Sequence, residues 1–241
     1  MNRKEKAFQA EAFCRYRRKS MEHAEKKRET IWETISKRRD SGQRTVSSRD
    51  MNAPYDVLDI SRFIINHSVR AGKGISNLKL QKVLYLVQAY FLIKRGVPCF
   101  RERIEAWDFG PVVPEAYREF RSYGSTLIPF ISSYIVFDRE NIWNSRRVKT
   151  DEDIISERDR KTIAEVTDFL SGFSATALGD LTRSQLPWMN AYAPNERNEM
   201  TCEAIRSYFA EKAEMKAEKK EEKGFTDDME DQKIKEGKEP E

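Results

Sequence analysis

The strongest hydrophobic pattern of this 241-residue chain lies between Gly74 and Phe91. One row of apolar residues recurs at the three- and four-residue spacing of a helix face: Leu80, Val83, Leu84, Val87 and Phe91. A second row lies beside it: Leu78, Tyr85, Ala89 and Leu92. Ser76 is suited to cap the first turn, and Gly96 and Pro98 to end the helix. A helix that is apolar on two sides is predicted to lie at the centre of its domain.

Four polar residues interrupt these rows: Lys79, Gln81, Lys82 and Gln88. Gln81 and Gln88 are seven residues apart, and Lys79 and Lys82 are three apart, so each pair shares a side of the helix. Two interpretations are open, a solvated rim and a contact surface for another macromolecule. Under both, we expect Gln81 and Lys82 to be exposed, so that replacing either by Ala barely changes stability.

A short strand is predicted over residues 103–107, followed by a tight turn over residues 108–111. Glycine tolerates backbone conformations that other residues avoid, and Pro111 is suited to begin a helix. The helix expected after it has an apolar face and ends at Gly124: Val113, Tyr117 and Phe120. Trp107 has two interpretations, a core side chain and a binding anchor next to a rigid turn.

The remaining patterns complete one domain. Asp56 is predicted to cap a helix with apolar residues from Val57 to Ile64, and residues 163–173 predict another, followed by a short helix capped by Ser174. Residues 126–137, rich in Ile, Phe, Tyr and Val, predict a buried strand or an irregular core segment. We therefore expect an α+β, predominantly α-helical single domain with a small, short-stranded sheet over residues 51–210.

Charge distinguishes both ends of the chain from this domain. Residues 1–50 carry 15 Lys and Arg against 8 Asp and Glu and few apolar residues, which predicts a basic, helical extension with a linker. Residues 211–241 are rich in Lys and Glu, which predicts a fraying helix and then a disordered tail. The basic clusters are either solvated or in contact with nucleic-acid phosphates: Arg15, Arg17, Arg18, Lys19, Lys26, Lys27 and Arg28.

The sequence contains no motif of catalysis. The two histidines, His23 and His67, are isolated, and residues 71–74 lack the spacing of a phosphate-binding loop. The cysteines are odd in number and far apart, which argues against a disulfide framework or a zinc cluster and for a reducing cytoplasm: Cys14, Cys99 and Cys202. No apolar stretch approaches the roughly 20 residues of a membrane span. We expect a cytoplasmic protein that is not an enzyme, with no cofactor, no metal and no membrane partner.

At three motifs the sequence resembles the Panacea antitoxin domain, a SocA-like, phage-associated prokaryotic family. The family pattern Leu-x-Leu-Gln-Lys-hydrophobic-Leu-Tyr-x-x-Gln is matched from Leu78 to Gln88, and Glu-Ala-Trp-x-x-Gly-Pro-Val-x-Pro-x-x-Tyr from Glu105 to Tyr117. A later pattern, Leu-x-x-Leu-Thr-His with a following Pro-Trp, is matched by Leu178, Leu181, Thr182, Pro187 and Trp188. Arg183 stands where that pattern has His. The resemblance covers residues 51–194.

The resemblance implies a component of a toxin–antitoxin system: an antitoxin that neutralises a cognate protein toxin, encoded next to it, by direct protein–protein binding. Three alternatives are open: a proteolytic adaptor, as one described relative is, that brings its partner to a cellular protease; a regulator that binds promoter DNA through the basic arm; and a phage accessory protein. The residues expected to bind the toxin lie in the first two motifs: Lys79, Gln81, Lys82, Tyr85, Gln88, Trp107, Asp108, Phe109, Gly110, Pro111 and Tyr117.

Overall fold

The structure is a computed structural model that describes residues 55–138 and 142–212. The predicted basic extension, with all seven candidate phosphate contacts, lies outside the described residues, as does almost all of the predicted C-terminal tail. The predictions made for both segments stay predictions, and so does the division of the chain into these three parts.

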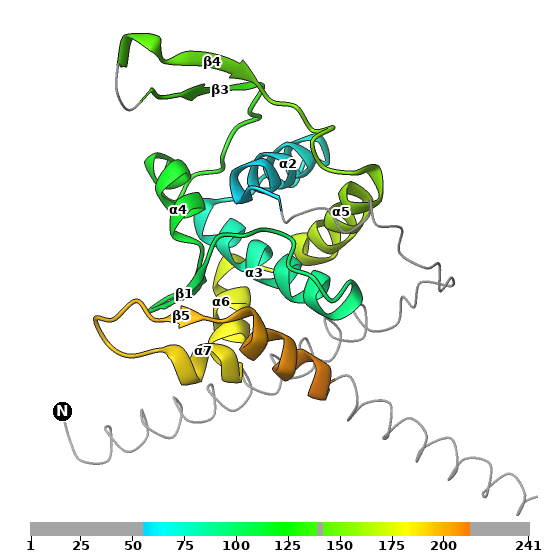
Figure 1. Ribbon diagram of the computed structural model, residues 1–241, viewed down its shortest axis with the longest axis vertical. Helices are drawn as coiled ribbons and strands as arrows, with labels where there is room; N and C mark the ends of the chain where they lie inside the picture. Colours follow the sequence, from blue (N-terminus) through cyan, green and yellow to red (C-terminus); the bar gives the residue numbers. More distant parts are fainter. Residues whose placement is uncertain (1–54, 139–141, 213–241) are drawn as a thin grey trace, which may run out of the picture.

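Within the described residues the fold is mostly helical with two small antiparallel sheets, which confirms the predicted fold class (Figure 1). The helices are α2 (Val57–Arg70), α3 (Asn77–Lys94), α4 (Pro114–Phe120), α5 (Glu157–Ser171), α6 (Ala175–Arg183) and α7 (Leu186–Ala191). The strands are β1 (Ile104–Trp107), β2 (Gly110–Val112), β3 (Ser133–Val136), β4 (Arg146–Lys149) and β5 (Glu199–Met200). Single 3-10 turns cover Arg121–Tyr123 and Ile142–Asn144, and residues 202–212 are helical.

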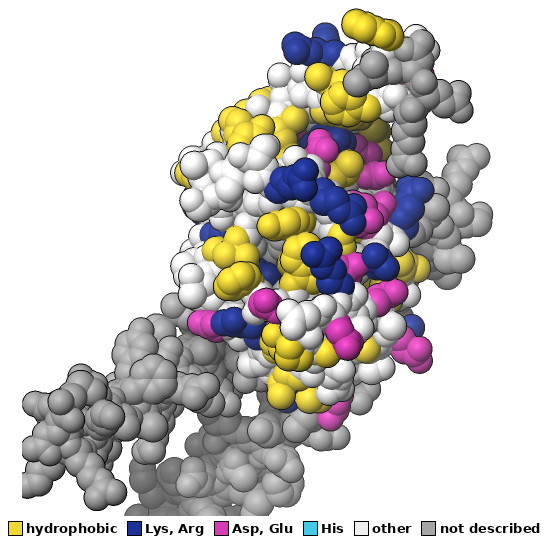
Figure 2. All heavy atoms as spheres, turned by 90° about the vertical axis from the view of Figure 1, so that its left-hand side faces the viewer, with side chains coloured by type: hydrophobic (Ala, Val, Ile, Leu, Met, Phe, Trp, Pro, Cys, Tyr) yellow, Lys and Arg dark blue, Asp and Glu magenta, His cyan; other side chains and the backbone are white. Residues whose placement is uncertain are grey.

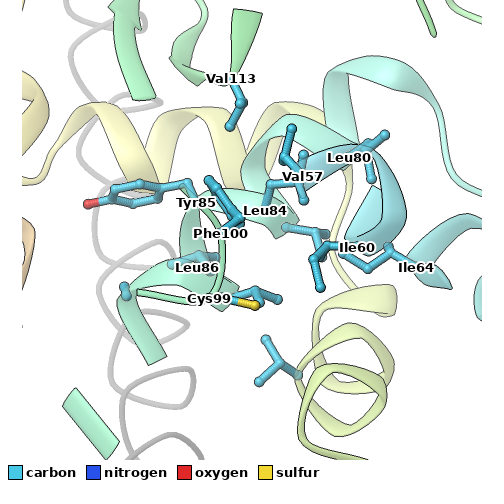
Figure 3. Packing of buried hydrophobic residues seen from close by; sticks show 14 of the residues in the cluster. Val57, Ile60, Ile64, Leu80, Leu84, Tyr85, Leu86, Cys99, Phe100 and Val113 are labelled. Atoms are coloured by element: carbon cyan, nitrogen blue, oxygen red, sulfur yellow. The ribbon is translucent and has the colours of Figure 1, made fainter. Parts of the chain in front are cut away.

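Helix α3 lies at the centre of the domain, as predicted, with other elements packed around it (Figures 1 and 3). Its side chains Leu80, Leu84 and Leu86 are fully buried, and they meet Val57 and Ile60 of α2 in one core. Burying an aliphatic side chain of this size contributes about 1.5–3 kcal/mol. Helix α3 takes the central position because it carries apolar residues on nearly every side, which are buried only if other elements surround it.

Capping side chains begin helices α2, α3 and α6 at the residues that the sequence predicts. The Asp56 side chain accepts a hydrogen bond from the Leu58 amide, and the Ser76 and Ser174 hydroxyls accept from the amides of Lys79 and Ala177. Each cap satisfies one amide that the first turn of a helix leaves without a partner.

Two local predictions are wrong. Pro111 does not begin a helix: it lies in β2, and α4 starts at Pro114. Gly110 and Pro111 continue the chain into an antiparallel pairing with β1, so the helix is delayed until Pro114 reaches its first turn, where a missing N–H costs nothing.

The second concerns residues 126–137: they do not form a buried strand, and the alternative of an irregular core segment is met only by Ile128, which is buried in the core, and Ile131, which packs against it. Their strand, β3, pairs with β4 in a two-stranded sheet, and its Ile135 and Val136 side chains are exposed. The sequence shows apolar residues here, but burial requires a second layer, and the described residues place no layer over the outer part of this hairpin.

A three-stranded sheet with the order β2-β1-β5 lies at the other end of the domain. The register of β1 with β2 places Glu105 opposite Val112 and Trp107 opposite Gly110. On its other edge β1 pairs with β5, which places Ile104 opposite Met200. In the part of the chain that the structure describes, no helix combines the length and apolarity needed to cross a bilayer.

Candidate functional site

The turn between β1 and β2 is the most exposed part of the second family motif and the centre of the candidate site. Because Trp107 pairs with Gly110, the turn itself consists of two residues, Asp108 and Phe109. The Phe109 side chain is 69% exposed, whereas Gly110, Pro111 and Val112 directly after it are buried. We call Asp108 and Phe109 the signature turn. A large aromatic side chain therefore extends into solvent from a strand pair whose remainder is packed in the domain.

Lys82 of α3 supports the signature turn from inside the domain. Its Nζ donates a hydrogen bond to the Pro111 carbonyl at 2.8 Å, and its side chain is completely buried. Gly110 has a φ of +97°, and a Cβ atom there would lie 3.1 Å from Lys82 Nζ and 2.9 Å from Thr182 Oγ1. Glycine at this position is therefore required both by the backbone conformation and by the close approach of α3 and α6.

Burial changes the proton affinity of Lys82. Removal from water disfavours the ammonium form and, with a smaller effect from the Arg183 charge, lowers the pKa of Lys82 from 10.5 to about 7. The carbonyl of Pro111 accepts a hydrogen bond from both the ammonium and the amine form.

The other polar residues of the first motif are also buried and also bind backbone groups. Gln81 Oε1 accepts a hydrogen bond from the Val113 amide at 3.0 Å, and Gln81 Nε2 donates to Asn77 Oδ1 at 2.9 Å. Gln88 Oε1 accepts from the amides of Cys99 and Phe100 at 2.8 and 3.2 Å. These contacts satisfy amides in the segments that flank β1 and β2, which would otherwise be buried without a partner.

Tyr85, which lies on the same side of α3 as Gln81 and Gln88, is also buried with a hydrogen-bond partner. Its hydroxyl donates to Gln185 Oε1 at 2.7 Å, and complete burial raises the pKa of Tyr85 well above its usual value, so the phenol keeps its proton. The hydrogen bond links α3 to the residue that precedes α7.

Our expectation that Gln81 and Lys82 are exposed is therefore wrong. The helical spacing correctly groups the polar residues, but their neighbours are the main-chain amides and carbonyls of β2 and the adjoining loops rather than water. In this arrangement the first motif holds the second motif in place.

Three side chains from α6 and α7 hold the signature turn from the outside. The Arg183 guanidinium donates to the Asp108 carbonyl at 3.2 Å, and Trp188 Nε1 donates to the Trp107 carbonyl at 3.0 Å. The Tyr192 hydroxyl donates to Asp108 Oδ1 at 3.0 Å, and this hydrogen bond raises the pKa of Tyr192. Arg183, at the position where the family pattern has His, thus contacts the turn directly. Sequence analysis missed Tyr192, although its four-residue spacing from Trp188 places both on one helix side.

Trp107 is packed beside the signature turn, and its interpretation as a binding anchor stays a prediction. It is half-buried: its indole N–H donates to Glu105 Oε2 at 2.7 Å, its ring meets Tyr117 edge-on at 5.0 Å, and the Arg197 guanidinium lies 4.7 Å from its ring centre. Glu105 is itself buried and forms an ion pair with Arg103 at 2.8 Å. The indole is therefore fixed in orientation beside the signature turn.

Helix α7 adds apolar surface near the signature turn. Leu186 and Met189 are exposed and lie three residues apart on one side, whereas Trp188 and Tyr192 stack at 4.4 Å on the side that binds the turn. We call Phe109, Leu186 and Met189 the signature surface.

The structure separates the residues predicted to bind a toxin into three groups. The buried residues are Gln81, Lys82, Tyr85, Gln88, Gly110 and Pro111. The half-buried residues are Lys79, Trp107 and Tyr117, and the exposed residues are Asp108 and Phe109. Lys79 Nζ donates to the Ser171 carbonyl at 2.8 Å at the end of α5, so it too has a structural partner.

The described residues contain no group of three or more His, Cys, Asp or Glu side chains arranged to hold a metal ion. His67, the histidine within them, lies in α2 and contacts Asp168 of α5 at 2.9 Å between its Nε2 and the carboxylate. The signature turn offers hydrogen-bonding and apolar groups but, on its described side chains, no activated nucleophile.

Comparisons with known proteins agree with the motifs. The sequence model of the family described as "Antitoxin SocA-like, Panacea domain" matches residues 80–189, from α3 to α7. The protein named "Antitoxin SocA" from Caulobacter vibrioides (strain NA1000 / CB15N) is 37% identical over 73 residues, which are 30% of this chain and 39% of that protein. The chain thus matches about two fifths of the length of this curated relative. No solved structure matches the chain. The resemblance to the SocA-like Panacea family is confirmed over the matched residues.

Proposed function

We propose that this protein is an antitoxin that neutralises a cognate protein toxin by binding it directly. The family match and the similarity to a protein named as an antitoxin support an antitoxin role for the matched segment. They favour a binding function over catalysis, and the composition of the signature turn agrees with that preference.

One observation carries the proposal that binding goes through the signature surface. Phe109 is highly exposed, yet the backbone on which it stands is held by Lys82 from inside and by Arg183 and Trp188 from outside. An exposed aromatic side chain on a fixed backbone loses little conformational freedom on binding, which is the property of an interface anchor. Leu186 and Met189, on the neighbouring helix α7, are exposed apolar side chains as well.

The role of the buried residues follows from this arrangement. Gln81, Lys82 and Gln88 bind main-chain groups, so they act on a partner only by keeping the turn in position. Contacts to a toxin are expected from Phe109, Asp108 and the exposed side of α7. Tyr192 then acts as a positioning residue, because its hydroxyl holds the Asp108 carboxylate.

The test is co-expression with the protein encoded by the adjacent open reading frame, followed by co-purification and measurement of the Kd. Phe109→Ala is expected to weaken the complex at least about tenfold and to reduce protection of cells, while leaving the melting temperature nearly unchanged. Ile154→Ala is the matched control, because Ile154 is 51% exposed but lies outside the signature surface. Its complex and its protection should equal those of the wild type.

Two results would overturn the proposal. Wild-type affinity and protection in the Phe109→Ala variant would remove the signature surface from the interface. Protection that needs a cellular protease, or that occurs without any co-purifying complex, would replace direct neutralisation by the adaptor function. Salt-sensitive retention on promoter DNA would instead support the regulatory alternative.

A further inference from the structure

The β3–β4 hairpin projects from the helical body at the end of the molecule away from α7 (Figure 1). Its register places Tyr134 opposite Val148 and Ile135 opposite Arg147. Within the described residues neither strand pairs with a third strand, so both outer edges keep main-chain groups that a further strand can bind. This hairpin lies outside the signature surface and has no part in the function proposed above.

The root of the hairpin is firmly attached to α2. The Asn66 side chain donates to the Ile131 carbonyl at 3.0 Å and accepts from the Ile131 amide at 2.7 Å. The Arg62 guanidinium lies 3.5 Å from the centre of the Tyr134 ring, and Thr150 donates from its amide to the Ser132 carbonyl at 2.9 Å. The hairpin is thus a defined projection with a fixed base.

Beyond this base the hairpin exposes adjacent apolar side chains. Phe137 is 66% exposed and Trp143 is 91% exposed, and Ile135 and Val136 are exposed as well. Isolated exposed apolar residues are common on protein surfaces, but four large ones on one small projection favour an interaction site. Figure 2 shows hydrophobic and Lys or Arg side chains together at the upper end of the molecule, where the hairpin lies.

The two strands of the hairpin carry charge of one sign, and the acidic Asp138 lies in the connection between them. Strand β4 exposes Arg146, Arg147 and Lys149, and neither β3 nor β4 contains an acidic residue. The pairing of Ile135 with Arg147 places an apolar and a cationic side chain next to each other on one face, and Val136 with Arg146 does the same on the other. Both faces therefore offer apolar contact flanked by positive charge.

We infer that the β3–β4 hairpin is a second interaction surface, which binds an acidic, apolar, extended segment of a partner protein along β4. The open edge supplies main-chain hydrogen bonds to such a segment, as in the addition of a strand to a sheet. Because side chains alternate along a strand, the carboxylates of the added strand stand beside Arg147 and Lys149 on one face, and its apolar residues stand beside Val148 on the other.

Other occupants fit less well. A second copy of this chain paired along β4 would bring like charges together, which is unfavourable between neighbouring strands. Nucleic acid would match the cations and the rings of Phe137 and Trp143, but it would leave the aliphatic Ile135 and Val136 without a matching contact.

The experiment uses the full chain and a fluorescent ten-residue peptide of alternating Glu and Val. A Lys-Val peptide of the same length tests the charge requirement. Only the acidic peptide is expected to bind, with an affinity that falls as salt is raised. The double variant Arg147→Glu with Lys149→Glu, and the milder Arg147→Gln with Lys149→Gln, should each weaken binding, the first at least about tenfold. The matched control reverses two exposed cations on another face, Arg118→Glu with Arg121→Glu, and should bind as the wild type.

The inference is overturned if the acidic peptide does not bind, if the Lys-Val peptide binds equally, or if the control pair loses as much affinity as the hairpin pair. Binding of a 20-nucleotide single-stranded DNA that is lost in the hairpin variants, without binding of the acidic peptide, would identify a nucleic-acid surface instead. The toxin complex of the hairpin variants, measured separately, distinguishes the two proposals. Loss of peptide binding with an intact toxin complex supports two independent surfaces.

Discussion

Lys82 and Pro111, which are 29 residues apart in the chain, are joined by a hydrogen bond of 2.8 Å from Nζ to the main-chain carbonyl. This contact connects the central helix to the strand that follows the signature turn. With the Gln81 contact to the Val113 amide, it means that the polar residues of the first motif determine where the second motif lies. Changes at these buried positions are therefore expected to act through stability and turn geometry.

Gly110→Ala is expected to lower the free energy of unfolding by about 1–3 kcal/mol, because the new methyl group combines a strained φ with overpacking. The φ of Gly110 is +97°, and the added Cβ would lie 2.9 Å from Thr182 Oγ1. Gly96→Ala is the control: its φ is +70°, but no atom lies within 4 Å of the added Cβ. Urea denaturation of both variants separates steric crowding from backbone strain. Equal losses would show that the contact with Thr182 has no effect.

The lowered pKa of Lys82 should be visible in the pH dependence of the free energy of unfolding. Its pKa in the folded state is lowered from 10.5 to about 7, so between these values the unfolded chain binds more protons than the folded protein. The contribution of Lys82 to stability therefore rises with pH across this window, by at most about 1.4 kcal/mol per pH unit, and is constant below and above it. In Lys82→Met this rise should disappear. The same slope in wild type and variant, from urea denaturation at several pH values, would contradict the lowered pKa.

Gln81→Ala is expected to destabilise the domain by about 1–3 kcal/mol, because the Val113 amide loses its buried partner. From the sequence we expected this substitution to leave stability almost unchanged, but that expectation assumed an exposed side chain, and Gln81 is buried. Arg118→Ala, on the exposed side of α4, serves as the control and should stay within about 0.5 kcal/mol of the wild type. The comparison requires only melting curves and denaturant titrations. A Gln81 variant as stable as the Arg118 variant would mean that water replaces the lost hydrogen bond.

Tyr192→Phe should show whether the Tyr192 hydroxyl positions the Asp108 carboxylate without contributing much to the stability of the domain. The exposed hydroxyl contributes little to the folded state, so the melting temperature should change by no more than a few degrees. The Asp108 carboxylate loses its partner, and if the signature turn contacts a toxin, the Kd of that complex should rise. Phe at this position keeps the stacking with Trp188, which makes the variant a test of the hydroxyl alone. An unchanged Kd would show that the carboxylate is positioned without Tyr192.

Several features of the fold were accessible from sequence because their causes are local. The spacing of Leu80, Leu84 and Val87 predicts a buried helix side, and Ser76 and Asp56 cap the next amides of their own helices. These interactions involve residues within a few positions of each other, so the chain carries the information directly.

The family motifs were also readable from the sequence, and so was a turn at Asp108 and Phe109, although Gly110 and Pro111, predicted to belong to that turn, lie in β2. What the sequence determined was therefore which elements form, where they begin, and which segment carries the resemblance. Whether a polar residue on a helix is buried or exposed cannot be predicted in this way, because it depends on which segment of the chain covers that side of the helix.

Only the tertiary structure decided that Gln81 and Lys82 are buried and that Ile135 and Phe137 are exposed. Helical spacing groups Gln81 with Gln88 and Lys82 with Lys79, but the strand residue that accepts the Lys82 hydrogen bond comes 29 residues further along the chain. The apolar strand β3 lacks the opposite partner layer that burial requires, within the part of the chain the structure describes. Burial is a property of packing between distant segments, and hydrogen bonds to main-chain groups offset the cost of burying these polar side chains.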